Sequence, residues 1–393
     1  MLIGVDGACW RNRRGFGRFT RELLKAMFAD PRDHEFRLFI DDEPDPEINH
    51  SSVRVIRVRT SRKVTEAAVA SGNRSPRDIL AFHRATAAEP LDIMFYPAVY
   101  SWFPTRRGLP SVVTFHDAIA ERYPELVFPD LHRRLFWGLK VRLACRQASR
   151  ILTVSEAAKD EIVKHLRIDP GRIDVVSEAA HPQFHPIADR ELRAAARRRA
   201  NLPAEARLIL YVGGFAPHKN LSRLLLGFSQ VLDRSRMEDV HLAFVGDPAG
   251  SGFHSNYEEL RAQIRDEPGL QGRVHFTGYV ADEDLVALYS DALALAIPSL
   301  SEGFGLPAIE ALSCGTPVLA SNSGAVPEVI GEAGLLFDPL EPAEIGEAIH
   351  QIARDADILT AVRARALERA QRFTWSRAAG LTYAVLEACG SPR

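Results

Sequence analysis

Short apolar runs alternate with longer amphipathic segments along the whole chain. The runs are rich in Val, Ile, Leu and Phe and only a few residues long, which is typical of buried strands. The segments between them carry apolar residues at helical spacing; examples are Phe19–Phe28, Ala157–His165, Leu221–Val231 and Asp284–Tyr289. Strands and helices that alternate in this way form βαβ units and parallel sheets. The pattern therefore predicts an α/β protein.

The predicted strands form two groups of about six, which is too many for one compact sheet of this kind. The first group comprises Leu2–Val5, Phe36–Ile40, Val53–Val58, Ile93–Tyr96, Val112–Phe115, Ile151–Val154 and Ile173–Val176. The second comprises Leu208–Val212, Leu242–Val245, Val274–Thr277, Leu293–Ile297, Val318–Ala320 and Leu335–Phe337. Each group predicts a doubly wound, Rossmann-like domain.

The alternating pattern lapses at His181-Pro182-Gln183-Phe184-His185-Pro186, where two prolines break regular structure. We therefore place an N-terminal domain at residues 1–184 and a C-terminal domain at residues 185–373, which opens with a helix over Arg190–Ala200. The stretch Trp375–Ala388 is again helical in pattern. The polar segment Thr60–Pro76 has little periodicity, and we expect a mobile surface loop there.

Composition narrows the class of protein. The 393 residues are 46% hydrophobic and 25% charged, which is typical of a globular protein. The 49 basic and 51 acidic residues leave a net charge of −2, so the protein has no overall positive electrostatic potential that would attract nucleic acid. No apolar run approaches the roughly 20 residues that span a bilayer, and the sequence around Met1–Asp6 lacks the regions of a signal peptide. These features favour a cytoplasmic protein.

The segment after the predicted strand Leu293–Ile297 is the most informative one. It reads Ser-Glu-Gly-Phe-Gly-Leu-Pro from Ser301, and its proline suits the first turn of a helix. Its glycines let the backbone approach a ligand, and the N–H groups at a helix start favour an anion such as a diphosphate. Glu302 precedes this helix and Glu310 lies about one turn into it. Carboxylates at these positions can accept hydrogen bonds from hydroxyl groups. A sugar and a ribose on either side of the diphosphate would supply those hydroxyls.

The two glutamates are separated by seven residues, with Gly-Phe-Gly-Leu-Pro between them and Gly-Thr-Pro-Val after them. This segment resembles the signature of the family-4 retaining glycosyltransferases. Members of this family have the GT-B fold, in which two Rossmann-like domains face a central cleft. The resemblance implies that the N-terminal domain binds the acceptor, that the C-terminal domain binds the donor, and that a helix over 374–393 packs back on the first domain. It implies that Glu302 orients the donor sugar and Glu310 holds the ribose. It also assigns donor binding to Gly303, Phe304, Gly305 and Leu306.

The resemblance extends into the first half of the chain. Gly15 and Gly17 lie in a segment similar to the glycine loop that leads into the first helix of the family, where backbone amides face the cleft. Val113-Thr114-Phe115-His116-Asp117 ends a strand with an imidazole, and ligands in parallel sheets bind at such strand ends. The resemblance implies that His116 contacts the donor sugar.

The segment Tyr211-Val212-Gly213-Gly214-Phe215-Ala216-Pro217-His218-Lys219-Asn220 matches the family's loop that carries the diphosphate-binding cation. Only 6 of the 49 basic residues are lysines, and Lys219 is the last of them. Many family members have an arginine where this chain has Gly214. We therefore expect Lys219 to be the principal cation, with Arg223 or His218 as assisting groups.

Three further positions fit the family pattern. Gly278 and Tyr279 follow a strand that holds the nucleotide base through backbone groups in the family, so the sequence does not identify the base. We interpret Ser155 mainly as a helix N-cap, and a position near the substrate is the less favoured interpretation. Glu328 lies near the site in the family, although a glutamate at a helix start is also favoured by the helix dipole.

We predict no metal and no other cofactor. Asp282-Glu283-Asp284 and Asp355-Ala356-Asp357 resemble the Asp-x-Asp motif of another glycosyltransferase plan, but neither follows a strand beside the diphosphate loop. The first is typical of a helix N-terminus, the second lies in a helical stretch, and we expect both to be solvated. Cys9, Cys145, Cys314 and Cys389 lie too far apart for a zinc knuckle or a redox dithiol.

The segment Leu131–Leu143 combines basic and apolar residues. Family members that act on lipid-linked acceptors dock on membranes through basic amphipathic surfaces, so the resemblance implies peripheral contact with the inner face of the membrane as one interpretation. The other interpretation, which we favour, is a core helix with a charged outer face.

The sequence thus predicts a cytoplasmic, metal-independent hexosyltransferase that retains the sugar's configuration. Its donor would be GDP-mannose or a UDP-hexose, with mannosyl slightly favoured, and its acceptor a glycan, a lipid-linked molecule or a small molecule, as in polysaccharide biosynthesis. One alternative is an inactive nucleotide-sugar-binding partner protein, which the departure at Gly214 supports. A two-domain dehydrogenase is disfavoured because Thr20 stands where a dinucleotide-binding loop needs its third glycine.

Overall fold

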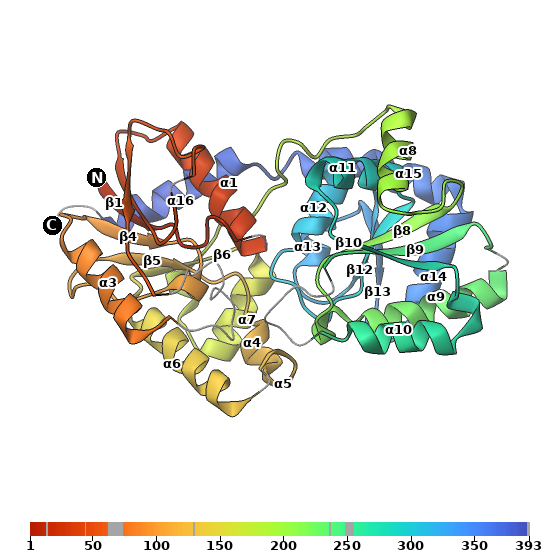
Figure 1. Ribbon diagram of the computed structural model, residues 1–393, viewed down its shortest axis with the longest axis horizontal. Coiled ribbons are helices and arrows are strands. Elements are labelled where there is room, and N and C mark those ends of the chain that lie inside the picture. The colour runs from red at the N-terminus through yellow and green to blue at the C-terminus, as the bar shows by residue number, and fades with distance from the viewer. Residues whose placement is uncertain are drawn as a thin grey trace. The chain divides into compact units, whose positions relative to one another are not determined.

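The computed structural model describes residues 1–12, 15–43, 45–61, 74–128, 130–235, 237–247 and 255–390 (Figure 1). Residues 62–73 of the expected loop at Thr60–Pro76 lie outside this set. The chain divides into two compact units. One comprises Met1–Glu178 and Thr374–Arg393, and the other comprises Ala179–Phe373.

The N-terminal unit is built on a parallel sheet of seven strands in the order β3-β2-β1-β4-β5-β6-β7. The four residues of β4 and of β5 are all buried, as expected for strands covered on both faces. The strands are β1 (Leu2–Asp6), β2 (Glu35–Ile40), β3 (Val53–Arg57), β4 (Ile93–Tyr96), β5 (Ser111–Thr114), β6 (Arg150–Thr153) and β7 (Ile173–Val175).

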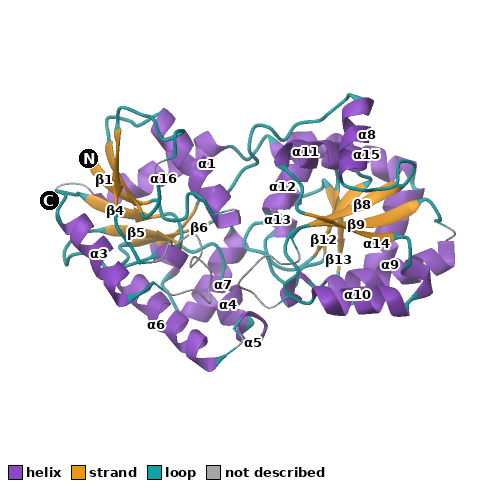
Figure 2. Ribbon diagram, viewed as in Figure 1, coloured by secondary structure: helices purple, strands orange, loops and turns teal. Residues whose placement is uncertain are grey.

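Helices cover both faces of this sheet (Figures 1 and 2). The final helix α16 packs on α1, where the Tyr383 hydroxyl donates to the Met27 carbonyl at 2.7 Å, so the end of the chain belongs to the N-terminal unit. α3, α6 and α7 cover the opposite face. The helices are α1 (Gly15–Ala29), α3 (Pro76–Ala87), η1 (Val99–Ser101), α4 (Ile119–Arg122), α5 (Pro124–Val127), α6 (Leu131–Gln147), α7 (Glu156–Leu166), η2 (Pro170–Arg172) and α16 (Trp375–Gly390).

The C-terminal unit contains a parallel sheet of six strands in the order β10-β9-β8-β11-β12-β13. Its core includes Leu210 and Ala296 on neighbouring strands and Phe228 on a helix, all fully buried. The strands are β8 (Arg207–Val212), β9 (Val240–Val245), β10 (Val274–Gly278), β11 (Ala294–Ile297), β12 (Val318–Ser321) and β13 (Gly334–Phe337).

Two layers of helices enclose this second sheet (Figures 1 and 2). α9, α10 and α14 form one layer, and α8, α11, α12, α13 and α15 form the other. The helices are α8 (Arg190–Arg199), η3 (Pro217–Lys219), α9 (Leu221–Ser235), α10 (Tyr257–Asp266), η4 (Pro268–Leu270), α11 (Asp282–Asp291), α12 (Leu306–Ser313), α13 (Val326–Ile330), α14 (Pro342–Arg354) and α15 (Ala356–Ala370).

The prediction of an α/β protein with two doubly wound domains is confirmed. Each expected strand is present, with ends that differ from the expected ones by at most two residues. In each sheet the strand order reverses beside one central strand: β1 lies between β2 and β4, and β8 lies between β9 and β11. Such reversals open a crevice at the carboxyl ends of the strands, which is the usual ligand site of open parallel sheets.

Candidate active site

Lys219 and Glu302 come together at the reversal point of the second sheet. Lys219 ends the short helix η3 that follows β8, and Glu302 lies in the loop that follows β11, the neighbouring strand. The Lys219 Nζ atom lies 2.7 Å from Glu302 Oε1 and 2.9 Å from Glu302 Oε2. The structure therefore joins two residues 83 positions apart in the sequence through a two-oxygen ion pair.

The Glu302 carboxylate is held in its ionised form. Burial alone would raise its pKa, but the Lys219 charge, its hydrogen bonds and a bond from Ser299 outweigh that effect, so the pKa of Glu302 lies below the ordinary value. The Ser299 hydroxyl donates to Glu302 Oε1 at 2.6 Å. A fixed anion and a fixed cation thus lie side by side at the strand ends.

Neighbouring loops fix both members of the pair. Asn220 has a left-handed backbone, with φ of 60°, and its side-chain amide donates to the carbonyl oxygens of Pro298 and Pro339 at 3.0 and 2.7 Å. On the other side, the Ala325 N–H donates to the Glu302 carbonyl at 3.2 Å. A side-chain carbon at Gly324, where φ is 71°, would lie 2.8 Å from the Glu302 nitrogen, so only glycine fits there.

The predicted anion site at the start of α12 has the expected backbone. Gly305 is the N-cap with φ of 93°, and a proline occupies the first turn. Gly303 is half-buried and lies next to Glu302. The side chains of Phe304 and Leu306 are buried, and Phe304 packs edge-on against Phe373 with 5.6 Å between the ring centres. If these two residues contact a donor, they do so through their backbone.

The sequence predicts that Glu310 is open to a ribose, but the structure buries its side chain. Its side chain is 4% exposed, and its Oε2 accepts a hydrogen bond from the Tyr289 hydroxyl at 3.3 Å. The carboxylate therefore has a protein donor in this structure, and its contact with a ribose stays a prediction.

The other predicted residues of this unit lie at its strand ends or nearby. Gly278 ends β10 with φ of 73°, and its carbonyl accepts from the Gly246 N–H at 3.0 Å. Tyr279 is 66% exposed. Glu328 is exposed in the first turn of α13, and its backbone carbonyl accepts from Arg369.

The groups expected to assist Lys219 divide into one that carries charge and one that does not. Burial and the adjacent Lys219 charge lower the pKa of His218 to about 4, so this imidazole is neutral near pH 7. Assistance of Lys219 by His218 stays a prediction. Arg223 donates from Nη1 to the Asn220 side-chain oxygen at 2.9 Å and stabilises the loop. No atom lies within 4 Å of where a Cβ at Gly214 would stand.

In the N-terminal unit, Gly15 and Gly17 lie in the first turn of α1, directly after the loop that follows β1. A side-chain carbon at Gly17 would lie 2.1 Å from the Asn12 carbonyl oxygen, so this glycine permits a close approach of loop and helix. His116 is 8% exposed after β5. Its Nε2 donates to the Pro97 carbonyl at 3.1 Å, and its Nδ1 lies 3.3 Å from Glu178 Oε1, so both ring nitrogens have protein partners.

The acidic pairs considered for a metal have structural roles. Asp284, in the first turn of α11, pairs with Arg199, so it is not simply solvated as expected. Asp355 caps α15 by accepting from the N–H groups of Asp357 and Ile358 at 3.0 Å. Within the described ranges, no group of three or more His, Cys, Asp or Glu residues is placed to hold a metal ion. Ser155 caps α7, as expected.

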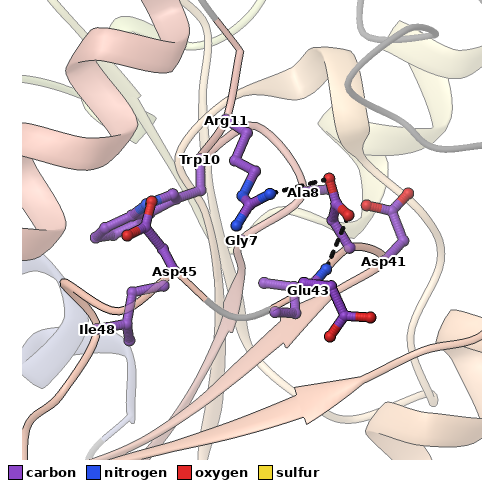
Figure 3. Close-up of a pocket in the computed structure, with 10 residues that line it drawn as sticks. Gly7, Ala8, Trp10, Arg11, Asp41, Glu43, Asp45 and Ile48 are labelled. Carbon is purple, nitrogen blue, oxygen red and sulfur yellow. Dashed lines mark hydrogen bonds and ion pairs between the residues drawn. The ribbon is translucent and has the colours of Figure 1, made fainter.

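A surface pocket opens elsewhere in the N-terminal unit, at the carboxyl ends of β1 and β2 (Figure 3). Its lining includes Asp41, Asp42 and Glu43 and none of the predicted site residues. The Asp42 carboxylate lies 3.7 Å from Arg11 Nη1 and accepts the Glu43 N–H at 2.8 Å. Because Arg11 already pairs with Asp42, we assign no ligand to the pocket.

Comparisons with known families match both units. Residues 13–184 match the model of "Glycosyltransferase Family 4", and residues 193–372 match that of "Glycosyl transferases group 1". The chain is also 30% identical over 372 residues to O-antigen chain mannosyltransferase B of Escherichia coli, with 92% of each chain covered. The chain belongs to the family-4, group 1 glycosyltransferases.

Other relatives and solved structures agree with this assignment. D-inositol 3-phosphate glycosyltransferase of Rhodococcus jostii (strain RHA1) is 30% identical over 276 residues, which cover 70% of this chain and 60% of the relative. Sucrose-phosphate synthase from Thermosynechococcus elongatus superposes with a TM-score of 0.76 at 23% identity, covering 99% of each chain. Anabaena Alr3699/HepE, solved with UDP and glucose, gives 0.73 at 19% identity over 98% of this chain and 99% of that one. The GT-B fold is thereby confirmed.

Sequence reasoning missed several residues that shape the site of this glycosyltransferase. Ser299, Asn220 and Gly324 fix the Lys219–Glu302 pair, and Glu178 faces His116. A partial signal existed for three of them, because Ser299, Glu178 and Gly324 follow predicted strands and so belong to the same sheet edges as the predicted residues. Nothing in the sequence showed which atoms they would contact.

Proposed function

We propose that this glycosyltransferase moves a hexosyl group from a nucleotide diphosphate sugar to an acceptor, with retention of configuration and without a metal. The observation that carries the proposal is the Lys219–Glu302 pair beside the N-terminus of α12. A cation and a helix N-terminus together suit a diphosphate. A carboxylate next to them suits the hydroxyls of the sugar attached to it.

Each group has a distinct role in the proposed reaction. The diphosphate would share Lys219 with Glu302, while Ser299 keeps the carboxylate in place. As the sugar–phosphate bond breaks, Lys219 and the amides of Gly303–Leu306 would stabilise the negative charge on the departing phosphate. That phosphate would accept the proton of the acceptor hydroxyl on the same face of the sugar. This route retains configuration and requires no protein nucleophile.

The donor class is proposed from the relatives. The mannosyltransferase relatives favour a mannosyl donor such as GDP-mannose, whereas the Anabaena structure with UDP and glucose favours a UDP-hexose. The O-antigen chain in the name of the Escherichia coli relative supports a glycan acceptor. A function in polysaccharide biosynthesis follows from the same relative.

A donor panel tests the proposal. The purified protein is incubated in EDTA with GDP-mannose, UDP-glucose and related donors, and release of the nucleoside diphosphate is measured. We expect slow hydrolysis of one donor, faster release with a suitable acceptor, and the donor's anomeric configuration in the product by NMR. Activity that requires Mg²⁺ or Mn²⁺, or an inverted product, would contradict the proposal. Binding of a donor without any turnover would favour the inactive partner protein instead.

We also propose peripheral contact with a membrane through α6, on the acceptor-binding unit. Leu131, Leu135, Leu139 and Leu143 recur every four residues on this helix and are between 41% and 65% exposed, and Phe136 beside them is 59% exposed. The outer face therefore combines apolar and basic side chains, whereas the favoured expectation was a charged outer face alone. Exposed arginines at 133, 134, 142 and 146 flank these side chains, and the helix has no acidic residue.

Exposed leucines among arginines fit an anionic lipid surface. Burial of the apolar side chains and attraction of the arginines to anionic lipids would both favour binding. No helix in the described part of the chain is long and apolar enough to cross a bilayer. The test is sedimentation with phosphatidylglycerol vesicles for the parent and the double variant Leu135→Ser/Leu139→Ser. We expect about tenfold weaker binding for the variant. Leu381→Ser, at a 41% exposed leucine of α16, is the matched control and should bind as the parent does. Equal binding of all three proteins would refute the contact.

A further inference from the structure

The reversal point of the first sheet holds an aromatic stack that the proposed reaction does not use. β1 and β4 are the neighbouring strands there, and their following segments carry Phe16 and Tyr100. The two rings stack with 4.7 Å between their centres and 28° between their planes. Phe16 stands between Gly15 and Gly17, so this stack holds the glycine turn at the start of α1.

The third ring comes from the helix α6. Trp137 is 6% exposed on the inner face of α6, and its ring centre lies 5.3 Å from that of Tyr100. One turn along the same helix, Lys140 donates from Nζ to the Tyr100 carbonyl oxygen. The helix therefore holds Tyr100 twice, by its ring and by its backbone.

Trp137 also reaches the segment that follows His116. Its indole Nε1 donates to Glu121 Oε1 at 2.7 Å, and Glu121 lies on α4. α4 begins just after Asp117, whose side chain accepts from the Ile119 N–H at 3.0 Å. One indole thus contacts the segments that follow two neighbouring strands, β4 and β5.

We infer that Tyr100 and Trp137 are positioning residues, which hold the glycine turn and the His116 segment in the arrangement that the transfer step needs. This inference rests on the proposed function, because it takes these two segments as parts of the reacting site. The Lys219–Glu302 pair belongs to the other unit, whose own loops hold it. Loss of the stack should therefore misplace groups at the transfer step and leave the binding of a nucleoside diphosphate at Lys219 unchanged.

The experiment measures turnover and binding separately on the full chain. We expect Trp137→Ala to lower kcat ten- to hundredfold, while the affinity for UDP or GDP stays within about twofold of the parent. Trp137→Phe keeps a stacking ring and should retain most of the kcat. Tyr383→Phe removes a buried hydrogen bond at the other end of α1 and is the control for general destabilisation. It should leave kcat unchanged at a temperature well below its melting point.

Hydrogen exchange provides a readout that does not depend on activity. Amides of residues 15–24 should exchange faster in Trp137→Ala than in the parent or in Tyr383→Phe. If the parent lacks transfer activity, the proposed function fails, and this exchange measurement still tests whether the stack holds the turn. Unchanged kcat and unchanged exchange in Trp137→Ala would overturn the inference, as would an equal loss of kcat in Tyr383→Phe.

Discussion

The two members of the Lys219–Glu302 pair should respond differently to substitution, because Lys219 keeps Glu302 ionised. Glu302 is a part-buried carboxylate, and the ammonium 2.7 Å away keeps it ionised. Removing Lys219 leaves a part-buried anion without a cation, whereas removing Glu302 leaves a cation that is open to another anion. Substitutions at the two positions should therefore have opposite effects on the binding of a diphosphate.

Substitutions of Glu302 and Glu310 should affect different quantities, turnover for the first and nucleotide affinity for the second. Glu302→Ala should lower turnover by about a hundredfold, because the sugar loses the group that aligns it, and should leave UDP or GDP affinity equal or higher. Glu310→Ala should weaken nucleotide binding instead. Glu310→Gln keeps an acceptor for the Tyr289 hydroxyl and controls for lost packing. Turnover and calorimetry on the three variants check this, and equal effects on both quantities would remove the separate roles.

Position 214 offers a rescue experiment. The first carbon of a side chain introduced there would have open space around it. We expect Gly214→Arg, added to Lys219→Ala, to recover part of the lost nucleotide affinity, on the order of tenfold. Gly272→Arg adds the same charge at another glycine with open surroundings and is the control; its φ of 72° strains a side chain, so the folding stability of both variants is measured alongside the affinity. No recovery in the Gly214→Arg/Lys219→Ala double variant would show that the introduced guanidinium does not reach the anion.

Glu121 gives a pH-dependent prediction. Burial raises its pKa from 4.5 to about 7, with Asp117 adding to the rise and the Trp137 bond opposing it. The folded state then holds a proton that the unfolded state has lost, so stability falls as the pH rises from about 4.5 to 7 and stays lower above that range. Glu121→Gln should abolish this loss and be more stable than the parent at pH 8, by on the order of 1–3 kcal/mol. Thermal melts at pH 5 and pH 8 test it, with the exposed Glu125→Gln as a variant that should leave the profile unchanged.

At the scale of elements, the site is an assembly of loops on one sheet edge. Asn220 joins the loop after β8 to the loop after β11, and the segment at Gly324 contacts Glu302 from the loop after β12. Within the loop after β11, Ser299 holds the Glu302 carboxylate, and together these contacts fix the ion pair. A change in one loop should therefore alter the site without removing any group that contacts the ligand.

Gly324 tests this view. Alanine at this position would meet the Glu302 nitrogen at 2.8 Å and would require a strained backbone with φ of 71°. We expect Gly324→Ala to cost roughly 1–3 kcal/mol of folding free energy and to lower turnover more than tenfold, because the Glu302 loop must move. Gly315→Ala also requires a positive φ, but its added carbon would only touch Leu367 at an ordinary contact distance of 3.9 Å, so it should lose a similar part of the stability and little turnover. Denaturant unfolding and turnover together distinguish the two. Normal turnover in Gly324→Ala would contradict the account.

Elements could be predicted from the sequence far better than side-chain environments could. Apolar runs marked the strands because β4, β5, β11 and β12 are buried along their whole length, and this signal is local. The motif also brought Lys219 and Glu302 to one site. The burial of Phe304 against Phe373, the Tyr289 bond to Glu310 and the exposed leucines of α6 depend on residues distant in the sequence, or on which face of a helix packs. No local pattern contains that information.

At the scale of the whole molecule, the two units divide the work. Each has its own doubly wound sheet with one reversal point, and the chain's last helix returns to the first unit. In our proposal the C-terminal unit binds the donor through Lys219, Glu302 and the start of α12. In the same proposal the N-terminal unit binds the acceptor and contributes the stacked glycine turn. The central claim is that a diphosphate binds at Lys219 without a metal.

Calorimetric titration of UDP and GDP into the parent and into Lys219→Ala, both in EDTA, tests that claim most directly. We expect one of the two nucleotides to bind the parent at a single site. Its dissociation constant should rise roughly thirty- to several-thousand-fold in Lys219→Ala, since loss of a desolvated, hydrogen-bonded charge costs on the order of 2–5 kcal/mol. Lys219→Arg should recover the affinity only in part, because a planar guanidinium presents its donors differently from an ammonium. Binding that appears only when Mg²⁺ is added, or equal affinity in Lys219→Ala and the parent, would contradict the account.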